Sequence, residues 1–198
     1  MIYPTTTGFH WGALDFQWYI EGCKSAPGFA MNKTGFHDVN RFISLGTHPG
    51  AGMQAIPDFV KMTVKGEETD LITPLDVSNR LHEHSEKALD ILESLKPGKD
   101  KELSFTLQDI KTMAFLGRYY SYKIAGSTYL ALYRETNDRK YQEEAVNELT
   151  NALDAWKKYS HEAMQQNHNP LWTNRVGYVD WIRLTQYVEE DIETAEMN

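Results

Sequence analysis

The sequence has little of several features that define common protein classes. Its 198 residues include one cysteine, Cys23, which excludes an intrachain disulfide and a zinc site built from several cysteines. Lysine and arginine together number 20 against 28 aspartates and glutamates, and the net charge of −8 argues against nucleic acid and anionic membrane surfaces as partners. All apolar runs are shorter than the roughly 20 residues that a membrane-spanning helix needs.

A secretory signal is also missing from the sequence. No basic stretch followed by an apolar core opens the chain. The beginning, Met1 to Phe9, reads as a loop preceded by an added methionine. We therefore expect the chain to be part of a longer protein, whose own signals decide the compartment.

The residues that are present suit a packed domain. Hydrophobic residues make up 41% of the chain, which lies in the globular range and argues against disorder. Aromatic residues reach 12%, and many stand in loops or beside polar residues. Aromatic faces suit both protein interfaces and the flat faces of sugars.

The chain divides into two parts at about residue 72. Residues 1–72 are rich in glycine, proline and aromatics, and predict an irregular segment of loops and short helices. The short helices are expected at Ala13–Cys23, Phe36–Ile43 and Pro57–Met62. Residues 73–198 instead show apolar residues three and four positions apart, which is the pattern of long helices.

Four long helices are expected in residues 73–198. The first begins with Thr73 as N-cap, a proline at the first position and an acid at the third, and it continues to about Leu95. The others are expected at about 107–133, 138–166 and 179–195. Short connections favour antiparallel neighbours, so we expect an all-α fold: an antiparallel bundle forming one compact unit with the N-terminal segment. No strand is expected. The predicted core residues are Leu81, Ala88, Met113, Gly117, Ile124, Leu149, Leu153, Trp156 and Val188.

The second and third of these helices resemble a tetratricopeptide helix pair. Small residues stand where such helices cross, at Ala114, Gly117 and Ala125, and a short polar turn follows at 135–138. A solenoid needs about three such units, and the sequence offers one. A pair that reached the same packing independently is the simpler interpretation.

Histidines and clustered acids give no metal site or cofactor site. His82 and His84 are two residues apart on a helix and point in different directions, and no His-Glu-x-x-His spacing occurs. The glutamates at 83, 86, 143 and 144 are most simply a solvated face. We expect no metal and no cofactor.

Segment 10–23 carries the most suggestive chemistry. Its aromatic and acidic residues are Trp11, Asp15, Trp18, Tyr19 and Glu21. Aromatic platforms with nearby carboxylates are typical of sugar sites, so these five residues are candidates for contact with a carbohydrate or another domain. The alternative is that the aromatic residues are core and the acids are caps or exposed.

The chain resembles the C-terminal region of large bacterial glycoside hydrolases, the α-glucuronidase-like proteins of polysaccharide-degrading Bacteroidetes. The matching stretches are Trp11–Cys23, Gly35–Ile43, Ile56–Val60, Thr73–Val77, Ala114–Gly117 and Asp180–Ile182. In that family a helical region follows a catalytic barrel. A barrel needs about 250 residues, so the chain is expected to lack the catalytic strands, and we assign it no catalytic residue.

This resemblance implies an accessory helical domain of an exported (periplasmic or cell-surface) enzyme that degrades polysaccharide. Its partners would be the missing catalytic domain and an oligosaccharide, and the fragment alone would be inactive. The alternative is a stand-alone tetratricopeptide-like module that binds a peptide or a protein. A third hypothesis is a small enzyme that uses Asp15 and Glu21.

Overall fold

The computed structural model describes residues 36–47, 50–173 and 177–197, and it is predominantly helical. This confirms the expected helical fold. The described helices are α2 (Val39–Ser44), α3 (Ile56–Lys65), α4 (Pro74–Ser94), α5 (Lys101–Thr136), α6 (Arg139–Ala163) and α7 (Trp181–Met197). A short antiparallel hairpin of β1 (Leu171–Thr173) and β2 (Gly177–Val179) precedes α7. The expectation of no strand is therefore wrong here, because strands of three residues are too short to show alternation in the sequence.

Capping residues fix where most of the long helices begin. The Thr73 hydroxyl accepts the Asp76 backbone N–H at 3.1 Å, and the Asp76 carboxylate accepts the Thr73 N–H at 2.9 Å, so the predicted start of α4 is correct. Helix α5 begins six residues before the predicted Leu107, because Asp100 caps it by accepting the Leu103 N–H. Asp138 caps α6 as the sequence indicated.

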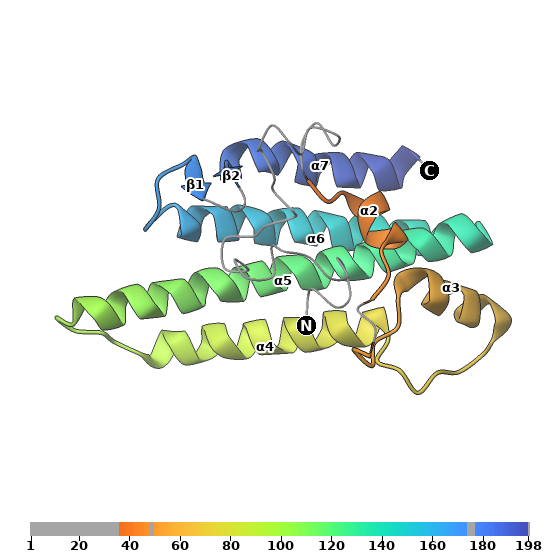
Figure 1. Cartoon of the computed structure of the whole chain (residues 1–198), viewed down its shortest axis with the longest axis horizontal. Coiled ribbons are helices and arrows are strands. Elements are labelled where there is room, and N and C mark those ends of the chain that lie inside the picture. Colours follow the sequence, from red (N-terminus) through yellow and green to blue (C-terminus); the bar gives the residue numbers. More distant parts are fainter. Residues whose placement is uncertain (1–35, 48–49, 174–176, 198) are drawn as a thin grey trace.

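The four long helices form a row rather than a closed bundle. Helix α4 packs on α5, α5 on α6 and α6 on α7, and the chain reverses direction from each helix to the next (Figure 1). Among the described residues, α4 has no more than marginal contact with α6 or α7. The helices are antiparallel to their neighbours as expected, but contacts that would close them into a four-helix bundle are not seen among the described residues. Helix α5 keeps a strip between α4 and α6 that no other described helix covers.

Two glycines of α5 lie at the helix crossings. A Cβ on Gly126 would lie 2.7 Å from Leu149 Cγ and 3.3 Å from the Ala145 carbonyl oxygen, so α6 approaches closely there. A Cβ on Gly117 would lie 2.7 Å from the Ser85 hydroxyl on α4. This confirms that small residues on the second long helix allow close packing of its neighbours.

Aromatic residues fill the core between α5, α6 and α7. Tyr119 and Trp156 make an edge contact with ring centroids 5.1 Å apart. The Trp181 indole N–H donates to the Tyr159 hydroxyl at 3.0 Å, and the Trp156 indole N–H donates to the Thr185 hydroxyl at 3.0 Å. These bonds satisfy the polar atoms of the buried rings and fasten α7 to α6.

The predicted core is partly correct. Ile124, Leu149, Trp156 and Val188 are buried. Leu81, Ala88, Met113, Gly117 and Leu153 are only partly buried, and the first four line a cavity between α4 and α5.

The described part of residues 1–72 packs on α5. Helix α2 buries Val39 and Phe42, and α3 buries Ile56 and Val60. The ends of both helices differ by one to three residues from the predicted ranges. Gly66, which follows the last residue of α3, adopts the left-handed conformation that ends the helix. The expected helix at Ala13–Cys23 lies outside the described residues.

Candidate functional site

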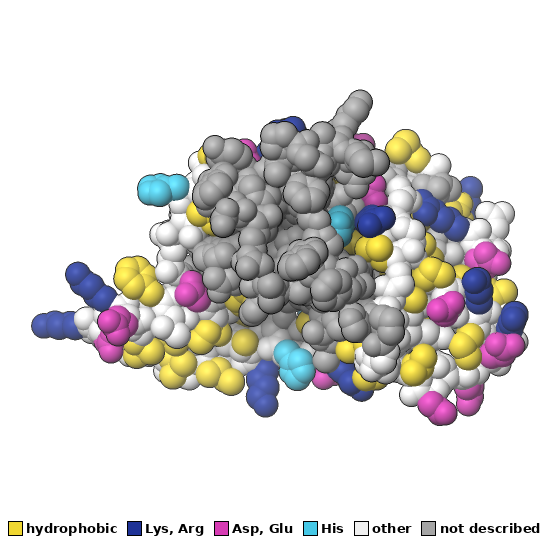
Figure 2. Space-filling model, in the orientation of Figure 1, with side chains coloured by type: hydrophobic (Ala, Val, Ile, Leu, Met, Phe, Trp, Pro, Cys, Tyr) yellow, Lys and Arg dark blue, Asp and Glu magenta, His cyan; other side chains and the backbone are white. Residues whose placement is uncertain are grey.

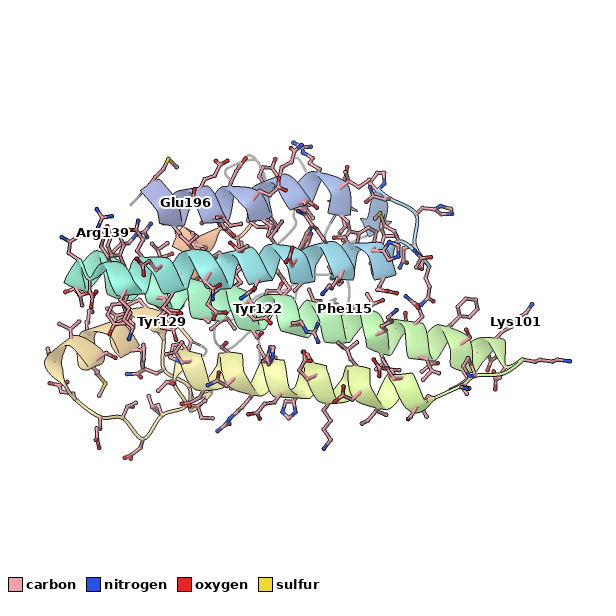
Figure 3. All side chains as sticks on the ribbon, turned by 180° about the vertical axis from the view of Figure 1, so that it is seen from behind. Lys101, Phe115, Tyr122, Tyr129, Arg139 and Glu196 are labelled. Atoms are coloured by element: carbon pink, nitrogen blue, oxygen red, sulfur yellow. The ribbon has the colours of Figure 1, made fainter. Side chains whose placement is uncertain are left out.

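A groove runs along the uncovered strip of α5. The strip consists of side chains spaced alternately four and three residues apart, which places them on one helical face: Lys111, Phe115, Arg118, Tyr122, Ala125 and Tyr129. Helices α4 and α6 form its two walls. Seen from behind, Phe115, Tyr122 and Tyr129 follow one another along this strip (Figure 3). We call this feature the α5 groove, and it contains two separate cavities.

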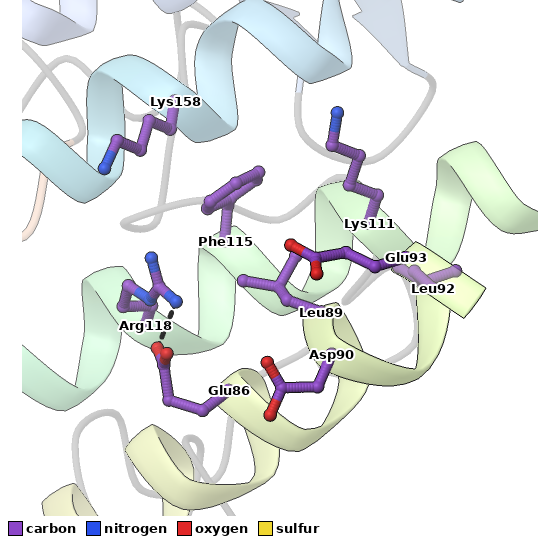
Figure 4. A pocket seen from close by; sticks show the side chains of 9 residues that line it. All are labelled: Glu86, Leu89, Asp90, Leu92, Glu93, Lys111, Phe115, Arg118 and Lys158. Carbon is purple, nitrogen blue, oxygen red and sulfur yellow. Dashed lines mark ion pairs between the residues drawn. The ribbon is translucent and has the colours of Figure 1, made fainter. Parts of the chain in front are cut away.

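The first cavity, the charged cleft, has a volume of about 490 Å³ and mixes cations with acids around Phe115 (Figure 4). Arg118 on α5 forms an ion pair with Glu86 on α4, and its guanidinium carbon lies 5.5 Å from the centre of the Phe115 ring. Lys111 lies 2.7 Å from Glu162 on α6. The two ion pairs thus tie α5 to both walls of the groove.

Glu162 is held as an anion at this end of the groove. Desolvation opposes its charge, but hydrogen bonds from Lys111 and from Gln108, at 2.7 Å, outweigh that effect and lower the pKa of Glu162. Because Lys111 pairs with Glu162 and Arg118 pairs with Glu86, the charged cleft works chiefly as a clamp between helices.

The second cavity, the tyrosine cleft, has a volume of about 320 Å³ and a different character. Three helices supply its lining. The residues are Leu75, Ser78, Asn79 and His82 from α4, Ser121, Tyr122, Ala125 and Tyr129 from α5, and Glu148 from α6.

Glu148 is a half-buried carboxyl group without a counter-charge. Burial raises the pKa of Glu148, and the neighbouring Glu144 raises it further. Burial also raises the pKa values of Tyr122 and Tyr129, so both remain neutral phenols at physiological pH. The cleft therefore combines one carboxyl group with two phenol hydroxyls.

Most polar groups of the tyrosine cleft have no partner within the described part of the chain. Three lining residues are exceptions. The Ser78 hydroxyl donates to the Ser121 carbonyl oxygen at 2.8 Å, the Ser121 hydroxyl donates to the Arg118 carbonyl oxygen at 2.7 Å, and His82 lies 4.0 Å from Glu86. By contrast, Asn79, Tyr122, Tyr129 and Glu148 make no hydrogen bond or ion pair with any described residue. These four side chains keep their bonding capacity for solvent or a ligand.

A third feature is an apolar surface where α4 and α5 join. Five of the nine exposed large hydrophobic side chains in the described residues lie there: Ile91, Leu95, Leu103, Phe105 and Ile110. Helices α4 and α5 form a helical hairpin, and we call these five residues the hairpin end. Figure 2 shows hydrophobic side chains gathered over this end of the molecule. A neighbouring cavity of about 440 Å³, lined by residues such as Leu81, Ala88 and Met113, continues the apolar surface between the two helices.

The site residues predicted from the sequence are not part of the α5 groove or the hairpin end. Trp11, Asp15, Trp18, Tyr19 and Glu21 lie outside the described residues. The groove was missed because its strip on α5 mixes charged with aromatic residues and lies on the face opposite the apolar stripe. Its only sequence signal is the spacing of Phe115, Tyr122 and Tyr129.

The acids expected on a solvated face differ in their environments. Glu83 and Glu143 are exposed, whereas Glu86 is engaged with Arg118. In the described ranges, no group of three or more His, Cys, Asp or Glu side chains is placed to hold a metal ion. None of the described helices combines the length and apolarity needed to cross a membrane.

Comparison of the chain with protein-family models, with curated proteins and with solved structures gives no match.

Proposed function

We propose that the chain is a non-catalytic helical domain of a larger, exported polysaccharide-degrading enzyme, and that it docks on the rest of that enzyme through the hairpin end. The resemblance to the C-terminal region of α-glucuronidase-like glycoside hydrolases suggests this context. The observation that carries the proposal is the exposed apolar surface of the hairpin end.

The exposure of this surface is large for an isolated domain. Phe105 is 59% exposed and Ile91 is 51% exposed, and both stand on regular helices where a polar residue would serve equally well. The first turns of α5 extend past the end of α6, so no other described helix covers them (Figure 1). Clustered exposed apolar residues are typical of a protein interface.

Binding between separately produced domains tests this docking. The chain is mixed with the purified remainder of the enzyme, and Phe105→Ser is compared with Ile182→Ser, which changes a similarly exposed residue on α7. The proposal requires that the chain binds and that Phe105→Ser weakens binding while Ile182→Ser does not. Equal affinities for the two variants would reject the hairpin end as the interface.

The second candidate function is a tetratricopeptide-like module that binds a peptide. The close crossing of α5 and α6 at Gly126 and the open α5 groove favour it. The reading frame of the whole protein separates the two candidates, because an accessory domain requires a catalytic barrel of about 250 residues in the same polypeptide.

A further inference from the structure

We propose that the tyrosine cleft is a binding site for an uncharged, hydroxyl-rich ligand, namely a neutral sugar ring. The inference rests on the proposed function for the source of that sugar, a neutral segment of the polysaccharide that the whole enzyme degrades. The cleft itself, with its residues from α4, α5 and α6, supplies the argument for the ligand chemistry.

The unpartnered groups of the cleft match the hydrogen-bonding needs of a sugar. The Glu148 carboxylate accepts hydrogen bonds, the Tyr122 and Tyr129 hydroxyls both donate and accept, and the Asn79 amide supplies two donors and an acceptor. A sugar ring carries several hydroxyls at fixed angles, each of which both donates and accepts. Groups from three separate helices therefore surround a single cavity with complementary bonding capacity.

Aromatic rings border the same cavity. Tyr122 and His82 have ring centroids 5.4 Å apart, and Tyr129 stacks on Tyr141 of α6 with centroids 6.4 Å apart. Tyr122, His82 and Tyr129 are amphipathic rings, which suit a pyranose that is apolar on its faces and polar on its rim. The cavity volume of about 320 Å³ is at the small end of known ligand pockets, which favours one or two sugar rings.

The charges around the cleft select against an anionic ligand. Glu148 and Glu144 stand together on α6 and would repel a carboxylate or a phosphate. In the described part of the chain, no lysine or arginine lines the cleft, and Arg118, whose charge acts on Tyr122, is already paired with Glu86. Hydroxyl groups can satisfy the Glu148 carboxylate without bringing a second full charge into a half-buried site, and this leaves a neutral sugar as the better fit.

Titration of the isotope-labelled chain tests the site by NMR. The probes are glucose, xylose and their neutral β-linked trisaccharides, with ethanolamine as a cationic probe. We expect at least one sugar to bind in the millimolar range and to shift amide signals around residues 79, 82, 122, 129 and 148. Absence of shifts with every sugar, or shifts confined to other regions, would overturn the inference. So would binding of ethanolamine alone.

Three variants connect the binding to named groups. Glu148→Gln keeps the shape and should raise the Kd of the bound sugar at least about tenfold, because a hydrogen bond to a charged group is lost. Tyr122→Phe removes one hydroxyl and should raise the Kd of the sugar a few-fold. Glu143→Gln makes the same charge change on an exposed part of α6 and should leave the Kd unchanged. Equal effects of Glu148→Gln and Glu143→Gln would also overturn the inference.

The result is separable from the docking test. Loss of sugar binding with intact docking at Phe105 would reject the tyrosine cleft and leave the accessory domain standing. Sugar binding at the cleft without any docking would instead retain the site and reject its enzymatic context.

Discussion

The Lys123 ammonium on α5 lies 2.9 Å from the Asp191 carboxylate on α7, and both side chains are shielded from solvent. The Lys123 ammonium also donates to the His37 carbonyl oxygen at 2.6 Å, and the carboxylate accepts the Val39 N–H at 2.8 Å. The ammonium lies 4.2 Å from the centre of the Phe36 ring. One buried ion pair therefore joins α5, α7 and the start of α2.

Removal of one charge of this pair should be costly. Asp191→Asn takes the counter-charge from the buried ammonium, and we expect the free energy of unfolding to fall by about 3–5 kcal/mol. The double variant Lys123→Met with Asp191→Leu should lose much less, because both buried charges disappear together. Urea melts measure both values. A loss below about 1 kcal/mol for Asp191→Asn would contradict the described burial.

The two glycine crossings predict losses of stability of different size on substitution by alanine. Gly126→Ala forces a Cβ against Leu149 and the Ala145 backbone oxygen, and it should cost about 1–3 kcal/mol. Gly117→Ala meets only the Ser85 hydroxyl, which would have to turn away from its bond to the Leu81 carbonyl oxygen. The better helix propensity of alanine should offset most of that cost. Thermal melts compare the two variants. A larger loss for Gly117→Ala would show that α4 and not α6 makes the tighter crossing.

Ionisation of Glu148 should weaken the fold slightly as the pH rises. Because the pKa of Glu148 is raised in the folded state, the protonated form is favoured there, and stability is lost as the pH rises through that pKa. Glu148→Gln should therefore unfold at a higher temperature at pH 7. The gain in free energy of unfolding should stay below about 1 kcal/mol, because the cleft is open to water. The difference should vanish below the ordinary glutamate pKa. A constant difference across this pH range would exclude ionisation as its cause.

Truncation of core residues of α6 to alanine should cost more stability the more deeply the residue is buried. A fully buried leucine that is truncated to alanine loses about 2–5 kcal/mol of stability, and the sequence pattern predicts Leu153 as such a core residue. Leu153 is only partly buried, whereas Leu149 is 1% exposed, so this magnitude now applies to Leu149→Ala. In denaturant melts, Leu149→Ala should lose much more free energy of unfolding than Leu153→Ala. The reverse order would show that the core of α6 is misplaced.

The isolated chain should hydrolyse no glycoside, since a barrel that holds a paired acid and nucleophile is expected only in the larger enzyme. Assays with aryl glycosides check this expectation. Turnover that is abolished by Asp15→Asn or Glu21→Gln would replace the accessory domain with a small enzyme.

The helices were predictable wherever local chemistry marks their ends. Thr73 and Asp138 are the N-caps of α4 and α6, and capping residues can be recognised without knowledge of the tertiary structure. The first turns of α5 escaped prediction because Leu103 and Phe105 are exposed and follow no buried stripe. Only the cap at Asp100 marks that start in the sequence.

The tyrosine cleft was not predictable from the sequence, because it exists only after two helices pack on a third. Glu148 and Tyr122 are 26 positions apart and belong to different helices, and no local motif connects them. The same holds for the row of helices. Apolar stripes indicate which faces are covered, but they do not state whether the last helix returns to the first.

Hydrogen exchange of the whole enzyme tests the central claim most directly. Amide exchange in residues 91–110 is compared between the isolated chain and the complete polypeptide, with residues 181–190 of α7 as the internal control. The accessory-domain account predicts markedly slower exchange at the hairpin end in the complete enzyme and little change in the control. Equal exchange in both proteins at residues 91–110 would contradict it.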